Sequence, residues 1–347
     1  MIGRDDLAVC RAMLRGGSRS FHAAGLLLPR RVMEPATALY AFCRVADDLI
    51  DGGAGGPEVL RERLDRIYAG LPDDYAEDRA LAAVVARHRL PRVLLDQLVE
   101  GFAWDVAGRQ YEDLADLQGY AARVAGTVGA AMAVLMGVRA PGVVARACDL
   151  GVAMQLSNIA RDVGEDARNG RLYLPRQWLR EAGICPDGFL AAPCWTPGLG
   201  RVVARLVAAA DGLYARADSG IAALPLDCRP GIGAARRLYA AIGHRAVAQG
   251  GALLERRAVV PGAVKLGLVA RAAVRSVMPG VLPGGGCEAF PLPAVRHLVA
   301  AVGACPVGVP VPVLASGLSL GRLVWVIELF ASLDARQAMA SAERDLA

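Results

Sequence analysis

Apolar residues recur at intervals of three and four along most of this chain, and this spacing constrains its fold more than any other feature. It predicts helices, because residues three and four apart share one face of an α-helix. No stretch alternates polar and apolar residues for long enough to build a sheet, so we expect an all-α fold, a helical bundle. Pro35 and Pro141 stand where helix starts are expected. The expected helices are Glu34–Asp51, Pro57–Tyr68, Arg92–Val106, Tyr120–Gly137, Val143–Val163, Leu199–Ile221 and Gly233–Arg256.

The composition indicates what such a bundle contains. Hydrophobic residues make up 54% of the 347, but aromatic residues only 5%, so the core consists mainly of alanine, valine and leucine. Small side chains allow helices to pack closely. So high an apolar content also suggests a lipid-like ligand or contact with a membrane.

The chain shows one change of character along its length. No long linker divides its first three quarters, so we expect one domain over residues 1–265. Beyond Lys265, prolines and a run of three glycines interrupt the helical spacing, and Leu298 to Gly321 carries no charge. Several prolines make that segment a poor continuous helix. For the extension 266–347 three interpretations stay open: packing on the bundle, contact with a membrane surface, or a membrane span.

Charge and cysteine usage exclude several classes of protein. The net charge is +5 and Lys265 is the only lysine, but the arginines are scattered and few aromatic residues lie among them, so no nucleic-acid partner is expected. The eight cysteines include no CxxC pair, which is typical of reduced thiols in a cytoplasmic protein. Charged residues precede any apolar run, so we expect no secretory signal. Gly231 and Gly233 form no dinucleotide-binding loop, since no strand precedes them.

Two acidic clusters carry the chemistry. The first contains Asp47, Asp48 and Asp51, and the second contains Asn158 followed by Asp162 and Asp166 at steps of four. Residues four apart lie on the same helix face, about 6 Å apart along its axis. Like charges at this spacing destabilise a helix unless a cation neutralises them, and oxygen ligands of this kind suit Mg²⁺.

Two facing helices with these clusters would hold Mg²⁺ around a diphosphate. Ionisation of an allylic diphosphate requires neutralisation of the negative charge that grows on the leaving group, and metals with arginines supply it. An apolar cavity would then shield the carbocation from water. The residues alone thus favour a class I enzyme that uses prenyl diphosphates.

Longer motifs narrow this hypothesis. The stretches YAARVAGTVG (120–129), LGVAMQLSNIARDVGED (150–166) and NGRLYLP (169–175) closely resemble the squalene/phytoene synthase family. So do SRSF (18–21) with LP (28–29), and YAFCRVADDLID (40–51). The resemblance covers roughly residues 15 to 260, in the family's order and spacing, and is greatest to the bacterial phytoene synthase branch.

The resemblance implies roles for individual residues. Mg²⁺, with Mn²⁺ as a possible substitute, would be bound by both clusters, while Asp48 would only assist. Diphosphate oxygens would be held by arginines, namely Arg44, Arg161 and either Arg256 or Arg257. Ser18, Arg19 and Ser20 would form a flap over a diphosphate. The implied residues of the reaction centre are Tyr40, Tyr120, Gln155 and Tyr239.

Each of these roles has a structural alternative. Tyr120 and Tyr239 could be core aromatic residues whose hydroxyls meet carbonyls. Ser18 and Ser20 could cap a helix, and the arginines could simply balance the neighbouring aspartates. Val128, Gly129 and Gly151 could be close helix-packing residues rather than walls of a pocket.

The activity implied by the resemblance is the head-to-head joining of two geranylgeranyl diphosphates through prephytoene diphosphate to phytoene. No NADPH is expected. Three rivals stay open: a dehydrosqualene or squalene synthase acting on farnesyl diphosphate, a terpene cyclase, and a non-catalytic scaffold with decayed metal sites. Lipid substrate and product imply a cytoplasmic protein bound peripherally at the inner face of the membrane, associated with downstream carotenoid enzymes.

Overall fold

The computed structural model describes residues 2–17, 24–51, 56–277 and 290–305. These residues form helices and turns and include no β-strand, so the all-α prediction is confirmed for them. The longer helices are α1 (Arg4–Gly17), α3 (Arg30–Asp51), α4 (Pro57–Tyr68), α5 (Ala76–His88), α6 (Arg92–Val106), α9 (Pro141–Arg168), α12 (Pro197–Ala223), α13 (Arg229–Gln249) and α14 (Gly262–Val277). The shorter elements are α7 (Leu114–Ala121), η1 (Ala122–Gly126), α8 (Thr127–Leu135), α10 (Arg176–Glu181), α11 (Pro186–Ala191), η2 (Gly250–Leu253), η3 (Pro293–Val295) and α15 (Arg296–Ala304).

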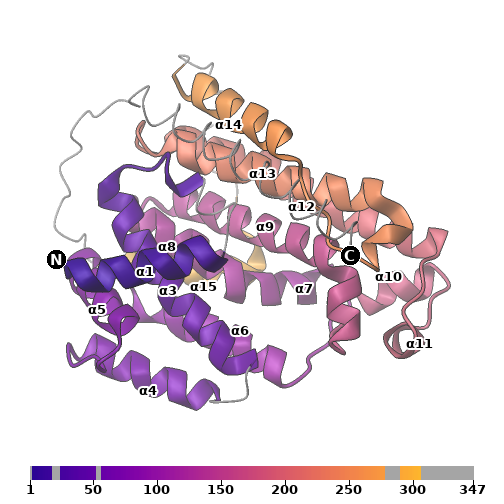
Figure 1. The fold of residues 1–347 in the computed structure, drawn as a ribbon, viewed down its shortest axis with the longest axis horizontal. Helices are drawn as coiled ribbons and strands as arrows, with labels where there is room; N and C mark the ends of the chain where they lie inside the picture. Colours follow the sequence, from indigo (N-terminus) through magenta and orange to yellow (C-terminus); the bar gives the residue numbers. More distant parts are fainter. Residues whose placement is uncertain (1, 18–23, 52–55, 278–289, 306–347) are drawn as a thin grey trace, which may run out of the picture.

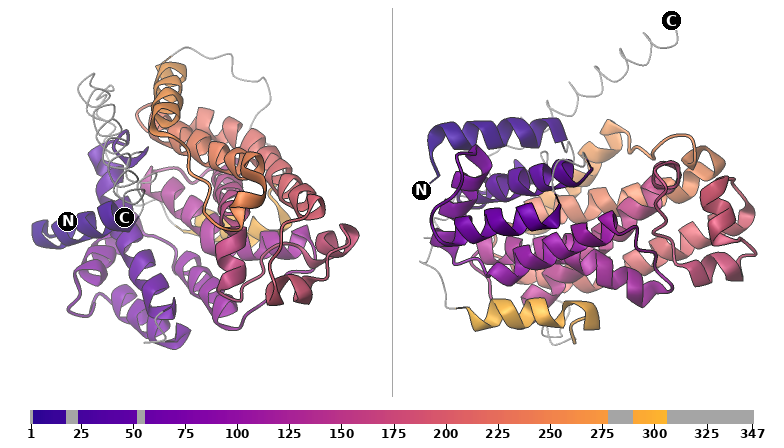
Figure 2. Two further views of the ribbon diagram at one scale, coloured as in Figure 1. Left: turned by 45° about the vertical axis from the view of Figure 1, so that its right-hand side comes forward. Right: turned by 90° about the horizontal axis from the view of Figure 1, so that it is seen from below.

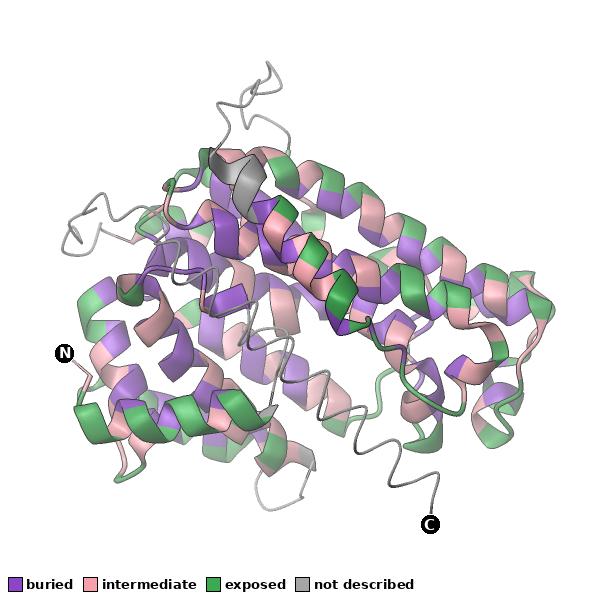
Figure 3. Cartoon of the chain, turned by 45° about the horizontal axis from the view of Figure 1, so that its top comes forward, coloured by how far each residue is buried: buried purple, intermediate pink, exposed green. Residues whose placement is uncertain are grey.

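The helix α9 runs through the middle of the bundle (Figure 1). It packs against α8, α12, α13 and α15, and most of its side chains before residue 160 are buried. Helices α3 to α6 form the other side of the bundle, and α14 covers α13 at the outside, with its exposed face turned away from the core (Figure 3). One large hydrophobic core runs through the bundle. A second, small cluster of buried residues lies under α14.

Glycines allow the closest helix contacts. A Cβ added at Gly129 would lie 2.1 Å from the carbonyl oxygen of Ala147, and one at Gly151 would lie 2.1 Å from that of Ala125. No side chain fits at such a distance, so the backbone of α9 meets those of η1 and α8 directly. Both glycines also line the cavity described below. They are therefore close helix-packing residues and also part of the wall of a pocket.

The helix expected over Tyr120–Gly137 is not continuous. It divides into α7, the π-helical turn η1 and α8, with the amide of Thr127 donating to the carbonyl of Ala122, five residues back. A π turn inserts one extra residue and rotates the faces on either side of it. As a result, Val124 and Ala125 face the cavity while Gly126 lies against Val295 of the extension.

Several expected helix ends also differ from the observed ones. Helix α3 begins at Arg30, and Pro35 lies inside it; the carbonyl of Pro29 accepts from the amides of Val32 and Met33, so the first turn forms before Pro35. Helix α13 ends at Gln249 rather than at Arg256, because Gly250 has a φ of 59°. By contrast, Pro141 occupies the first turn of α9 as predicted.

Part of the extension packs on the bundle. Val295, Leu298 and Val302 are fully buried, and α15 lies on the side of the molecule opposite α1 (Figure 2, right). Residues 306–347, with most of the uncharged segment 298–321, lie outside the described residues. In the part of the chain that is described, no helix is both long and apolar enough to cross a membrane.

Candidate active site

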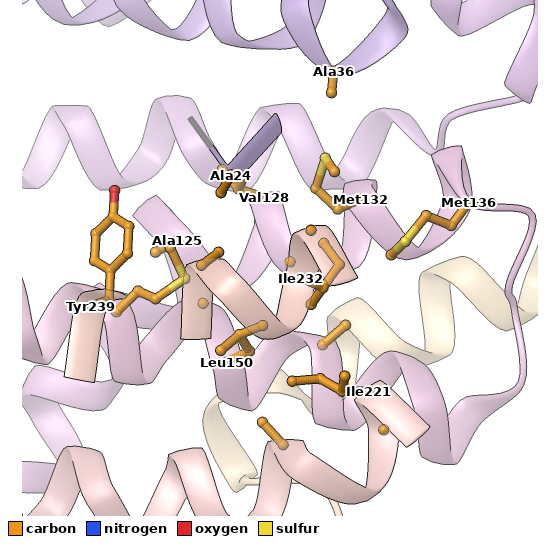
Figure 4. A pocket seen from close by; sticks show the side chains of 18 of the residues that line it. Ala24, Ala36, Ala125, Val128, Met132, Met136, Leu150, Ile221, Ile232 and Tyr239 are labelled. Atoms are coloured by element: carbon orange, nitrogen blue, oxygen red, sulfur yellow. The ribbon is translucent and has the colours of Figure 1, made fainter. Parts of the chain in front are cut away.

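A cavity of about 240 Å³ lies inside the bundle. Its wall is almost entirely apolar and comes from α3, η1, α8, α9, α12 and α13, together with the segment before α3. Tyr239 stands at one end, and Met136 and Ile221 lie toward the other (Figure 4). Such a cavity holds an extended apolar chain away from water.

Polar groups gather at the end near Tyr239. Tyr40, Gln155 and Asn158 line this end together with Tyr239, so the structure brings together four residues that the sequence indicated. Burial raises the pKa of Tyr40, Arg44 lowers it, and Tyr239 and Asp47 raise it. Tyr40 of α3 and Tyr239 of α13 thus lie near each other at this end of the cavity.

The second acidic cluster continues from this mouth along α9. Arg161 donates to both carboxylate oxygens of Asp162, at 2.8 and 2.5 Å. Arg257, in the segment after η2, contacts Asp162 at 2.9 Å and Glu165 at 2.5 Å. Of the two arginines that the sequence left open, Arg257 is thus the one that reaches the carboxylates of α9.

Asp166 lies one turn further along α9. Burial raises its pKa to about 7, and the carboxylates of Asp162 and Glu165 raise it as well, whereas Arg171 and Arg257 act against the shift. A cation bound beside this buried carboxyl would favour its charged form.

The first acidic cluster lies at the end of α3 and is more open. Arg44 holds Asp48 through two hydrogen bonds of 3.1 and 2.5 Å and lies 3.6 Å from Asp47. About half of the Arg44 and Asp47 side chains is exposed. Asp51 is the last residue of α3, but its side chain is not among those described. The predicted flap residues Ser18, Arg19 and Ser20 also lie outside the described residues.

Tyr120, expected at the reaction centre, contacts Asp105 rather than the apolar cavity. The described residues that line the cavity do not include it. It is buried, and its hydroxyl donates to Asp105 of α6 at 2.9 Å, while the hydroxyl of Tyr173 donates to the other carboxylate oxygen at 2.7 Å. The rings of Tyr120 and Tyr173 stack 5.1 Å apart. Tyr120 therefore belongs to a buried cluster formed with Asp105 and Tyr173.

Asp105 was missed by the sequence analysis, and it connects the two acidic clusters. Burial raises its pKa, the tyrosine hydrogen bonds and Arg171 lower it, and Asp47 raises it. Arg171 also lowers the pKa of Asp166, so it lies near the carboxylates of both α6 and α9. The motif containing Tyr173 pointed to this region, but nothing in the sequence around Asp105 did.

The donor set suits an oxygen-liganded divalent cation. The side-chain oxygen of Asn158 is buried and has no hydrogen-bond partner among the described residues, and such an atom normally has one. Aspartate and asparagine oxygens are the ligands that Mg²⁺ prefers. Within the described part of the chain, however, no three acidic, histidine or cysteine side chains already surround a common metal position.

An all-helical bundle with an apolar cavity, and with aspartates and arginines at its mouth, defines the class of isoprenoid synthases. The family model for squalene/phytoene synthase matches residues 14–263, and the chain belongs to this family. Its relatives include phytoene synthases from Rhodobacter capsulatus, 53% identical over 86% of this chain and 90% of that protein, and from Cereibacter sphaeroides, 45% identical over 99% and 98%. A solved dehydrosqualene synthase is 29% identical, with a TM-score of 0.73 over 78% of this chain and 96% of the other.

Proposed function

We propose that this chain is a phytoene synthase, an enzyme that joins two geranylgeranyl diphosphates head to head. The identity of 45–53% with proteins named phytoene synthase over most of the chain carries this proposal. The cavity supports it, since an apolar cavity with a charged mouth suits a prenyl diphosphate. This reaction is the first committed step toward carotenoids.

The reaction has two half-reactions, and each releases one diphosphate and one proton. In the first, the C1–oxygen bond of one substrate breaks, and the double bond of the second substrate attacks C1 to give the cyclopropane of prephytoene diphosphate. In the second, the remaining C–O bond breaks, the skeleton rearranges and a proton is lost to give phytoene. No electrons are gained or lost overall, so the reaction requires no reductant such as NADPH.

We infer that the family's divalent metal is Mg²⁺ and that the two acidic clusters hold it. Its ligands would be Asp47, Asp51, Asn158, Asp162 and Asp166, with Asp48 in support. Bound there, the metal would neutralise the charge that develops on the departing diphosphate.

Side chains of the protein would bind the diphosphate, line the space around the reacting carbons and exclude water. Arg44, Arg161 and Arg257 lie against the carboxylates, and their guanidinium groups would bind diphosphate oxygens in bidentate fashion. Tyr40, Gln155 and Tyr239 face the space where the reacting carbons would lie. Asp105 orients Tyr120 and Tyr173 by accepting a hydrogen bond from each hydroxyl. The apolar wall excludes water, which would otherwise quench the carbocation.

Two further features belong to the proposal. Residues 1–265 would form the synthase domain, with 266–347 as an extension. Because substrate and product are lipids, we expect peripheral contact with a membrane at its inner face and association with downstream carotenoid enzymes.

The second candidate is a dehydrosqualene synthase, favoured by the structural likeness to a solved enzyme of that name. It would use the same site on the shorter farnesyl diphosphate. The scaffold alternative is less consistent with the chain, since the aspartates of both clusters are present.

Incubation of the purified protein with Mg²⁺ and geranylgeranyl diphosphate, without NADPH, should give a C40 hydrocarbon identifiable by mass. Treatment with EDTA should abolish it, and added Mg²⁺ should restore it. Formation of product at an unchanged rate in EDTA would contradict the role of the metal. A folded protein that forms no product from either geranylgeranyl or farnesyl diphosphate would support the scaffold alternative.

A further inference from the structure

Helix α14 lies on the surface of the molecule although few of its residues are polar. Of its 16 residues, none is acidic, and those with polar side chains are Lys265, Arg271, Arg275 and Ser276. The helix packs along α13, and its other face is turned away from the core (Figure 3). A surface helix normally presents polar and charged residues on its outer side. The composition of α14 therefore indicates that its outer side contacts something other than water.

The exposed residues at the start of α14 are mainly apolar. Ala263, Val264 and Gly267 are exposed, whereas Val269 faces the bundle and is fully buried. Val264 is 49% exposed, and Val259, in the segment that leads into the helix, is 53% exposed. Apolar residues that are exposed together on one side of a helix mark a surface for a partner or a membrane.

The chain around this helix is strongly basic. Residues 229–277, which contain α13 and α14, include nine arginine or lysine residues and a single carboxylate, Glu255. Their net charge is +8, against +5 for the whole chain, so the other residues together carry −3. The cause is a scarcity of carboxylates, because arginines occur along the whole chain. Positive charge is therefore concentrated on the side of the molecule that carries α13 and α14.

Some of this charge is neutralised within the protein. Arg236 pairs with Asp218 of α12 at 3.0 Å, and Arg257 contacts Asp162 of α9 at 2.9 Å. Other cations of the segment are exposed and, within the described part of the chain, pair with no carboxylate. They are Arg245, Arg256 and Arg271. These side chains can therefore bind an anionic partner without losing an ion pair of their own.

Arginines and valines are exposed together on α13, on α14 and in the segment between them. The α14 face comprises the exposed residues Arg245, Val259, Val264 and Arg271. It lies over one wall of the cavity, since Ala24 and Ala235 both line the cavity and belong to the cluster of apolar residues under α14. A partner on this face would be separated from the cavity by α13 and α14.

We propose that the α14 face binds the surface of a membrane that contains anionic lipids. A helix that lies in the interface of such a membrane places apolar side chains at the edge of the acyl chains and basic side chains beside the phosphates. The valines and arginines of the α14 face match these two requirements. The inference rests on the proposed function, whose lipid substrate and product give the contact its use, and it adds the surface and the class of lipid.

The test measures binding of the full chain to vesicles by co-sedimentation. The wild type should bind vesicles made of equal parts phosphatidylcholine and phosphatidylglycerol, and high salt should release it because salt screens exposed charges. It should bind vesicles of phosphatidylcholine alone much more weakly. Failure to bind the anionic vesicles would overturn the inference and leave a protein partner as the occupant of the face. Equal binding to both kinds of vesicle would overturn it as well.

Two variants locate the contact on the α14 face. Combining Arg245→Glu with Arg271→Glu should weaken binding to the anionic vesicles about thirtyfold or more, since each cation near an anionic surface contributes about 1 kcal/mol. Val264→Ser keeps the charge but removes apolar surface, so it should weaken binding about threefold or more. Circular dichroism checks that both variants are folded.

The matched control combines Arg61→Glu of α4 with Arg87→Glu of α5. Both arginines are exposed, and the two changes alter the net charge as much as those on the α14 face do. Helix α4 lies at the bottom of Figure 1 and α14 at the top. The control should therefore keep most of the wild-type binding. Equal losses in the control and in the α14 variant would show that only net charge matters and would overturn the inference.

Activity separates this inference from the proposed function. With geranylgeranyl diphosphate in detergent, the α14 variants should turn over at the wild-type rate, because none of the changed residues lines the cavity. A wild type that binds anionic vesicles but forms no hydrocarbon would refute the proposed function alone. A wild type that forms the C40 hydrocarbon but binds no vesicles would refute the membrane contact alone.

Discussion

Replacing Asp162 with asparagine should reduce turnover of geranylgeranyl diphosphate by about 10³-fold or more, since each tenfold loss corresponds to about 1.4 kcal/mol of transition-state stabilisation and a metal site supplies several kcal/mol. The substitution keeps the size of the side chain but removes a charge from the middle of the α9 cluster, where Arg161 and Arg257 also contact it. Diphosphate release measures turnover, and circular dichroism checks that the helical fold remains.

The control for this experiment is Asp187→Asn on α11. Asp187 also pairs with an arginine, Arg176, at 3.0 and 3.2 Å, but it is exposed and does not line the cavity. We expect its activity to equal that of wild type. If both variants retained full activity, the role assigned to Asp162 in metal binding would be wrong.

Replacing Arg63 with methionine should lower the free energy of unfolding by about 3–5 kcal/mol, as expected when one partner of a buried ion pair is removed. Arg63 of α4 binds Asp78 through hydrogen bonds of 2.9 and 2.7 Å and Glu77 through one of 2.8 Å. The side chains of Glu77 and Asp78 are 7% and 0% exposed. Without the arginine, two carboxylates remain buried without a countercharge. Denaturant unfolding followed by circular dichroism measures the loss.

Arg61→Met is the matched control. Arg61 also lies on α4, but its partner Glu58 is exposed. Exposed pairs of this kind contribute little, so the unfolding midpoint should barely move. Replacing Glu77 and Asp78 by their amides in the Arg63→Met background should recover part of the stability. Equal midpoints for Arg63→Met and Arg61→Met would contradict a stabilising role for the network.

The sequence predicted helices well where one amphipathic pattern is bounded by strong local signals. The bounds of α4 and α6 agree with the prediction, and both helices bury one regular face. The π turn η1 was not foreseen, because its extra residue leaves the apolar spacing almost unchanged. Helices α1, α5, α14 and α15 were not foreseen either; α15, at nine residues, is short for its pattern to be recognised.

The site was predictable where it follows from positions on one helix. The steps of four from Asn158 to Asp166 place these residues along α9 in any helical fold, and Gln155 lies on the same side of it. Contacts between distant segments were not predictable in this way. The pairing of Asp105 with Tyr120 and Tyr173 depends on how α6, α7 and the loop after α9 meet in the bundle. The same is true of Arg216 of α12, which binds the buried carboxylate of Asp149 on α9, remote from it in sequence.

The activity expected of this site is the joining of two twenty-carbon diphosphates without a reductant. Its most direct test is a competition in which the purified protein receives equal amounts of geranylgeranyl and farnesyl diphosphate with Mg²⁺, with and without NADPH. We expect a C40 hydrocarbon with the mass of phytoene to dominate, and we expect NADPH to change neither its amount nor its mass. A predominant C30 product, or a C40 product that forms only with NADPH, would contradict it.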